Sequence, residues 1–82
     1  MSEGIEQRRR AIRESVERAG GIVAFRKALS VTHQGVYYWI KVGHVPVDKA
    51  LQIEALFGTP RADIVEPKVA AALAAPSGAD LV

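Results

Sequence analysis

Apolar residues recur at helical spacing along most of this 82-residue sequence and predict a series of short amphipathic helices. The first is expected over residues 5–19, where the pair Gly20–Gly21 ends the pattern. Three more are expected over residues 22–29, 33–41 and 47–57. No segment of useful length alternates between apolar and polar residues as a strand does. The sequence therefore predicts an all-α fold, a small bundle of four to five helices.

Residues suited to helix ends support these boundaries. Thr32 is a good N-cap for the third helix, and Pro46 suits the first position of the fourth. Gly58 is the expected C-cap of that fourth helix. Thr59–Pro60 then opens a short helical turn, which we expect to extend to about residue 65.

Pro67 marks the expected end of the folded part of the chain. We assign residues 1–67 to one domain. The remaining residues, 68–82, are rich in Ala and also contain Pro, Ser and Gly. They are expected to form a flexible tail, with at most a transient helix at 69–75.

The third and fourth helices each show an inner and an outer face. The inner face of the third carries Val36, Trp39 and Ile40. Its opposite face has no acidic residue and consists of Gln34, Tyr37, Tyr38 and Lys41. The inner face expected for the fourth helix consists of Val47, Ala50, Ile53, Leu56 and Phe57.

The composition excludes several kinds of function. Apolar residues make up 49% of the chain and charged residues 24%, which is ordinary for a globular domain. The absence of cysteine excludes disulfides, thiolate metal sites and cysteine nucleophiles, and fits a cytoplasmic protein. Neither His33 nor His44 has a second ligand at metal-binding spacing, and no serine lies in a nucleophile motif. We therefore expect no enzyme, no metal, no cofactor and no membrane span.

The charge is mildly basic overall and unevenly distributed. The net charge is +2, but residues 1–27 contain seven Arg and Lys against four Asp and Glu. Acids four positions away account for Arg10, Arg13 and Arg18 as ordinary ion pairs on a helix. Arg8 and Arg9 have no such partner, so they are the better candidates to bind phosphate, and Arg9 is our choice.

The segment after Gly20–Gly21 has the spacing of a helix-turn-helix. A twenty-residue window that begins at Ile22 places apolar residues at the five positions that the motif requires, namely Phe25, Leu29, Val31, Val36 and Trp39. The run GGIVAFRKALSVTHQGVYYWIKVGHVP also resembles the Cro-like family of phage and bacterial DNA-binding regulators, including YdaS-type antitoxins. The resemblance covers roughly residues 5–67, and it implies a lambda-repressor-like fold.

Two residues depart from the family pattern. Arg26 stands where a small Ala usually lies between the two helices, so its aliphatic stem must lie along the groove with its charged end in water. Ser30 stands where the turn usually has Gly. It is therefore expected to adopt a positive φ, at a cost of about 1 kcal/mol.

The resemblance implies a transcriptional regulator, a repressor in its simplest form, that places residues 32–41 in the major groove of double-stranded DNA. The base-reading and nearby contacts would come from Thr32, His33, Gln34, Tyr37, Tyr38 and Lys41. The phosphate contacts would come from Arg26, Lys27 and Arg9. Relatives bind two-fold sites as dimers, so a homodimer is expected on DNA.

Other interpretations of the same residues remain open. Tyr37 and Tyr38 could be packing residues, Thr32 a cap alone, and Gln34 an uninvolved surface residue. The arginines could form a solvated face. The main alternative function is a protein-interaction module or antitoxin-like regulator, in which the Tyr37–Tyr38 surface binds a protein partner.

Overall fold

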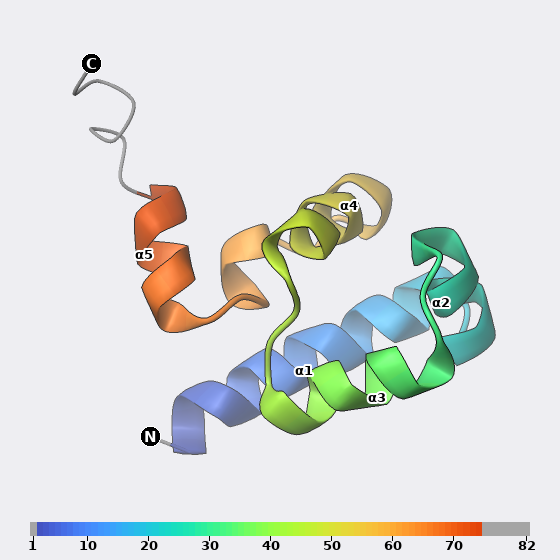
Figure 1. Ribbon diagram of the computed structural model, residues 1–82, viewed down its shortest axis with the longest axis horizontal. Coiled ribbons are helices and arrows are strands. Elements are labelled where there is room, and N and C mark those ends of the chain that lie inside the picture. The colour runs from blue at the N-terminus through green and yellow to red at the C-terminus, as the bar shows by residue number, and fades with distance from the viewer. Residues whose placement is uncertain (1, 75–82) are drawn as a thin grey trace.

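The computed structural model describes residues 2–74 and contains only helices and loops over that range. The all-α expectation is therefore confirmed for this part of the chain. Five α-helices and one 3₁₀ turn follow one another (Figure 1): α1 Ser2–Ala19, α2 Ile22–Leu29, α3 His33–Val42, α4 Val47–Phe57, η1 Arg61–Asp63 and α5 Pro67–Ala74. Each boundary predicted for the first four helices lies within three residues of the observed one.

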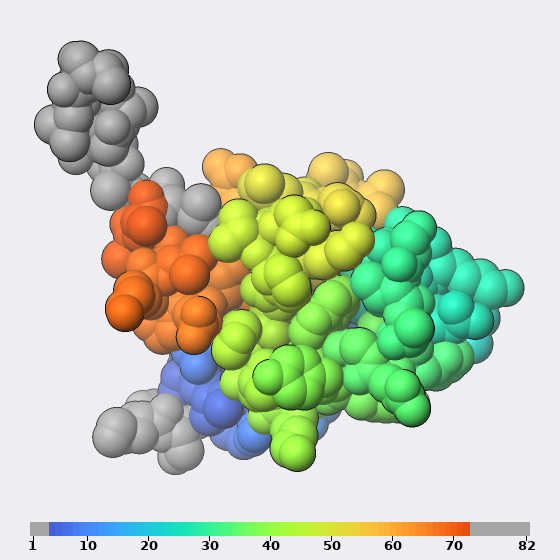
Figure 2. Space-filling view, in the orientation of Figure 1, coloured from blue at the N-terminus to red at the C-terminus, as the bar shows by residue number. Residues whose placement is uncertain are grey.

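The long helix α1 supports the rest of the bundle. α3 lies alongside α1 and runs in the opposite direction, whereas α2 packs at the C-terminal end of α1 (Figure 1). α4 covers the other side of the core, and η1 joins it to α5. The exposed side of α3 is consequently left uncovered by any other described helix (Figure 2).

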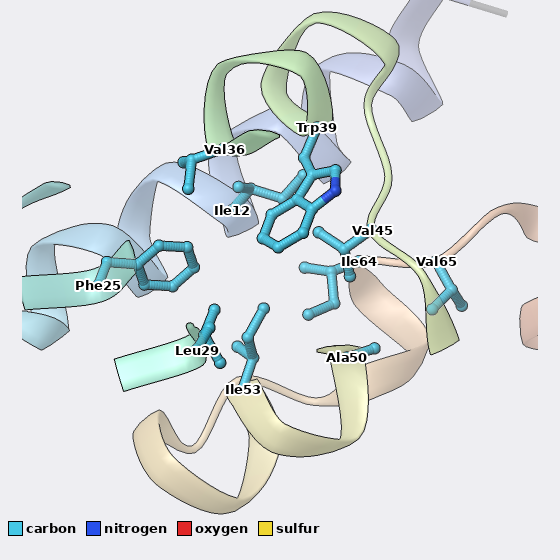
Figure 3. Close-up of a cluster of buried hydrophobic side chains, with 10 residues drawn as sticks. All are labelled: Ile12, Phe25, Leu29, Val36, Trp39, Val45, Ala50, Ile53, Ile64 and Val65. Carbon is cyan, nitrogen blue, oxygen red and sulfur yellow. The ribbon is translucent and has the colours of Figure 1, made fainter. Parts of the chain in front are cut away.

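One cluster of apolar side chains forms the core. Side chains from α1, α2, α3 and α4 converge in it, together with side chains from the loop before α4 and the loop after η1 (Figure 3). They are Ile12, Phe25, Leu29, Val36, Trp39, Val45, Ala50, Ile53, Ile64 and Val65. Trp39 is only 7% exposed, which confirms its predicted burial. Burial of a large apolar side chain such as Phe25 or Leu29 stabilises the fold by roughly 1.5–3 kcal/mol.

The ends of α2 and α3 have the conformations that their sequences predict. Thr32 caps α3, because its Oγ1 accepts a hydrogen bond from the Gly35 amide at 3.0 Å. Ser30 has φ 58° and ψ 46°, so the predicted left-handed conformation is confirmed. The Val31 amide then donates to the carbonyl of Arg26 at 3.0 Å, which closes the last turn of α2.

The inner face of α4 is narrower than the sequence suggests. Ala50 and Ile53 are fully buried and Phe57 is partly buried, but Leu56 is 56% exposed and Val47 37% exposed. The inward assignment of Leu56 and Val47 is therefore wrong. The two residues lie about half a turn apart around the helix, so one core cannot cover both.

The segment expected as a tail begins with α5, which overlaps the stretch 69–75 where the sequence predicts a transient helix. This helix begins at Pro67, and its Val69 and Ala70 pack partly buried against the core. Two small apolar contacts beside η1 are enough to hold a helix that lacks a large apolar face. The rest of the tail, residues 75–82, lies outside the described residues. Over residues 2–74, no helix combines the length and apolar character that a bilayer span requires.

Candidate nucleic-acid interface

The exposed side of α3 presents the residues that the sequence assigned to base contacts. Gln34, Tyr37, Tyr38 and Lys41 are all exposed, with the two tyrosines at 57% and 61%. Val36 and Trp39 are buried on the opposite side, so the predicted division of this helix is confirmed. Neither tyrosine is a core residue, because more than half of each is exposed.

The N-terminal turn of α3 adds two polar groups beside that exposed side. His33 is half-buried, and its ring centroid lies 6.4 Å from that of Tyr37 in a tilted arrangement. Thr32 is partly committed to the cap, since its oxygen accepts the Gly35 amide. Its hydroxyl hydrogen remains available to donate to an external acceptor. The structure thus brings six of the nine predicted site residues together on one helix.

Arg26 and Lys27 lie in the last turn of α2, directly before the turn that leads to α3. Lys27 is exposed and Arg26 is half-buried. The Nε of Arg26 is buried and has no hydrogen-bond partner among the described residues. A guanidinium that has lost part of its hydration in this way gains more from an external anion than a fully solvated one does.

Arg9 is held by the protein, contrary to the sequence prediction. Its Nε donates to the carbonyl of Ile40 at 3.0 Å, and its Nη2 donates to that of Lys41 at 2.8 Å. Its Nη1 pairs with Glu6, one turn away. The expectation that Arg9 lacks a structural partner is therefore wrong, and we no longer assign it to phosphate.

The other arginines of α1 also differ from the predicted ion pairs. Arg8 donates from Nε to the carbonyl of Gly43 at 2.7 Å, and Arg18 donates from Nη1 to that of Phe57 at 3.2 Å. None of the acids that the structure describes lies within ion-pair distance of Arg10, Arg13 or Arg18. The three predicted i,i+4 pairs are wrong: Arg18 bonds to a backbone carbonyl instead, and solvent screens the exposed side chains of Arg10 and Arg13.

A common principle explains these contacts: a cation from another helix caps the C-terminal carbonyls of α2, α3 and α4. Lys49 donates to Leu29 at the end of α2 at 2.9 Å. Arg8 and Arg9 donate to carbonyls at the end of α3, and Arg18 donates to a carbonyl at the end of α4. Carbonyls at helix ends have no partner within the helix and carry partial negative charge, so cations there are favourable.

Arg13 is a candidate that the sequence analysis passed over. It lines an open groove of about 300 Å³ between α1, α2 and α3, together with Tyr37 and Ile40. It is exposed and lies beside the exposed side of α3. The i,i+4 spacing of Arg13 and Glu17 predicted an ion pair, so Arg13 was not counted as a cation available to phosphate. In the structure Glu17 lines the same groove but forms no ion pair with Arg13.

A second groove, of about 220 Å³, borders the other tyrosine. Tyr38, Val47 and Val69 line it, with His44 and Glu66 among the polar residues at its edge. Each exposed tyrosine thus borders a shallow groove on its own side of α3. Within residues 2–74, no three His, Asp or Glu side chains gather as a metal-binding group.

Comparisons of this chain with protein-family models, with curated proteins and with solved structures give no match.

Proposed function

We propose that this protein is a sequence-specific DNA-binding transcriptional regulator of the Cro-like helix-turn-helix kind, and that it represses by occupying its site. One observation carries the proposal: the exposed side of α3 consists of an amide, two phenols and an ammonium group, with no carboxylate. Phosphates repel carboxylates, and donors and bifunctional amides suit both the phosphate oxygens and most base edges.

The dimensions of α3 suit the major groove. A ten-residue helix is about 15 Å long and about 10–12 Å wide with its side chains. The major groove of B-DNA is about 12 Å wide and admits one such helix. In the helix-turn-helix arrangement, α2 crosses the backbone while the N-terminal residues of α3 contact bases.

The exposed residues then have separate roles. Gln34 pairs with the N6 and N7 positions of adenine, and Lys41 binds guanine or the backbone. Tyr37, Tyr38 and the N-terminal pair Thr32–His33 donate to base acceptors or phosphates. Lys27 and Arg26 of α2 hold the adjacent phosphates, and Arg13 adds a further cation on the Tyr37 side of α3.

A monomer of this size offers little contact area, so a homodimer on a two-fold site supports useful affinity. The half-sites would then lie about one helical turn of DNA apart. The modest net charge of +2 also favours two copies over one, because sequence-independent attraction to phosphate grows with the number of cations.

The test begins with selection of bound duplexes from a random pool, followed by titration of Gln34→Ala on the selected duplex and on random DNA at several salt concentrations. Loss of the base contact should weaken binding to the selected duplex by about 1–3 kcal/mol and leave random DNA nearly unchanged. Gln52→Ala, which alters an exposed glutamine on α4, is the matched control and should change neither. Equal losses on both duplexes, or no loss, would refute base reading by Gln34.

A protein-binding function is the second candidate, because each exposed tyrosine borders an apolar groove. Val16 and Ile22 lie beside Tyr37, whereas Val47 and Val69 lie beside Tyr38. Tyrosine next to a pocket is a frequent centre of protein interfaces. Salt separates the two functions, since DNA binding weakens steeply as salt rises and an apolar protein interface does not.

A further inference from the structure

We propose that Arg8 and Arg9 are positioning residues: they fix the C-terminal end of α3 against α1 and thereby set the orientation of its exposed side. The effect on DNA recognition rests on the proposed function. The effect on α3 itself does not, and it can be measured without DNA.

The contacts form a clamp at one end of one helix. Arg9 donates to the carbonyls of Ile40 and Lys41, at 3.0 Å and 2.8 Å. Arg8 donates to that of Gly43 at 2.7 Å, one residue beyond the end of α3. The carbonyls of Ile40 and Lys41 lie in the last turn, where α3 has no amide to offer them, and Gly43 is the C-cap residue. Two arginines thus bond two terminal carbonyls of the helix and the carbonyl of its C-cap residue.

The chemistry of Arg9 suits this position better than that of lysine. Its planar guanidinium presents Nε and Nη2 to two successive carbonyls while Nη1 pairs with Glu6. A lysine ammonium is a point charge without this fixed fork. The Arg9 side chain is 28% exposed, so solvent screens its bonds less than those of a free surface arginine.

The side chain of Ile5 in α1 also approaches the end of α3 closely here. Gly43 is buried and has φ 83°, which disfavours any residue with a Cβ. A Cβ at this position would overlap the side chain of Ile5. The hydrogen bonds of Arg8 and Arg9 therefore add to a direct contact between Ile5 of α1 and Gly43 at the end of α3.

The clamp is adjacent to the residues proposed to read DNA. The carbonyl of Lys41 accepts a bond from Arg9, while the side chain of Lys41 is exposed on the outer side of the same turn. Tyr38 lies one turn earlier. Base contacts tolerate only about half an ångström of displacement, so a frayed last turn would lose sequence preference before it lost attraction to phosphate.

The experiment compares Arg9→Lys and Arg9→Ala with the neighbouring control pair Arg10→Lys and Arg10→Ala. Arg10 is exposed and bonds to no carbonyl of α3 among the described residues. The first readout is amide hydrogen exchange of Gly43 and His44, whose N–H groups donate to the carbonyl of Trp39. Both Arg9 variants should exchange about tenfold faster there, as expected for loss of a charged hydrogen bond, and the Arg10 variants should not.

The second readout is the ratio of affinities for the duplex selected from a random pool and for random DNA, together with its salt dependence. A clamp predicts a smaller ratio in both Arg9 variants and an unchanged salt slope. A phosphate contact predicts an unchanged ratio, and a salt slope lower by about one unit in Arg9→Ala only. Measurements are made where circular dichroism shows each variant to be folded, and Arg9→Lys serves if Arg9→Ala does not fold.

The outcomes separate the two proposals. Unchanged exchange at Gly43 and His44 in both Arg9 variants would overturn the clamp, whatever the protein binds. If the unmodified chain selects no duplex at all, the DNA-binding function fails, while the exchange measurement still decides whether Arg9 holds α3. Faster exchange with an unchanged affinity ratio would overturn the link between the clamp and recognition.

Discussion

Replacement of Ser30 by glycine should stabilise the protein. Ser30 is exposed and has φ 58° and ψ 46°, the left-handed region that residues with a Cβ rarely adopt. Its hydroxyl makes no hydrogen bond with the described residues. The bonds around it use only the backbone, from the Ser30 amide to Lys27 and from the Val31 amide to Arg26. Glycine would keep these bonds and remove the strain.

Two opposing effects determine the size of the gain. A left-handed conformation costs a residue with a Cβ about 1–2 kcal/mol. Glycine, however, gives the unfolded chain more freedom, which lowers stability by about 0.4–1 kcal/mol. The net increase in the free energy of unfolding should be about 0.5–1 kcal/mol. In a domain of this size, that gain raises the melting temperature by about 3–6 °C.

Thermal and urea unfolding followed by circular dichroism would measure this change. Ser30→Ala is the control, because alanine removes the hydroxyl but keeps the Cβ and the strain. It should leave the melting temperature within about 2 °C of that of the original chain. A lower melting temperature for Ser30→Gly, or an equal gain in both variants, would refute the assignment of strain to the left-handed backbone.

Two further predictions follow from the core and from α5. Trp39→Ala should lower the free energy of unfolding by about 3–5 kcal/mol, enough to unfold most small domains; a native tryptophan emission already typical of water would contradict its burial. Truncation after Pro67 should lower stability by about 1 kcal/mol in urea titrations, because it removes the half-buried Val69 and Ala70. Truncation after Ala74 retains both contacts and should show little loss, and equal losses in the two truncations would contradict this role of α5.

The helices and their ends could be predicted because local rules determine them. The spacing of apolar residues located α2 and α4 to the residue, and Thr32, Ser30 and Gly58 have the end conformations that their residue types favour. The buried and exposed sides of α3 follow from the same spacing. Whether α2 and α3 cross as in a helix-turn-helix on DNA stays a prediction.

The roles of the arginines could not be predicted because they depend on tertiary contacts. The i,i+4 rule considers only neighbours on one helix, so it paired Arg13 with Glu17 and left Arg9 free. The structure reverses these roles, because two of the three bonding partners of Arg9 are carbonyls about thirty residues away, and the third is Glu6, at i,i+3 rather than i,i+4. A sequence pattern shows no sign of a bond to a backbone carbonyl, since every residue has one.

The exposed Leu56 and the packed Val69 have a similar cause. Both depend on how far a small core extends around α4 and η1, and periodicity alone does not give the width of that core. The spacing of apolar residues therefore does not predict which side chains at the edge of a bundle are buried. It does predict the burial of large central side chains such as Trp39.

The long-range capping of helix ends restricts how this surface could be transplanted. α2 and α3 contain eight and ten residues, and isolated helices below about 12–15 residues are marginal in water. The cations at their ends come from positions 20 and 31–35 residues away in the chain. A peptide spanning residues 20–44 would contain the whole exposed side of α3 and its Thr32 cap, but none of the cations that cap the C-terminal ends of α2 and α3. The surface is therefore not a portable module, and a graft onto another scaffold would need a substitute for α1.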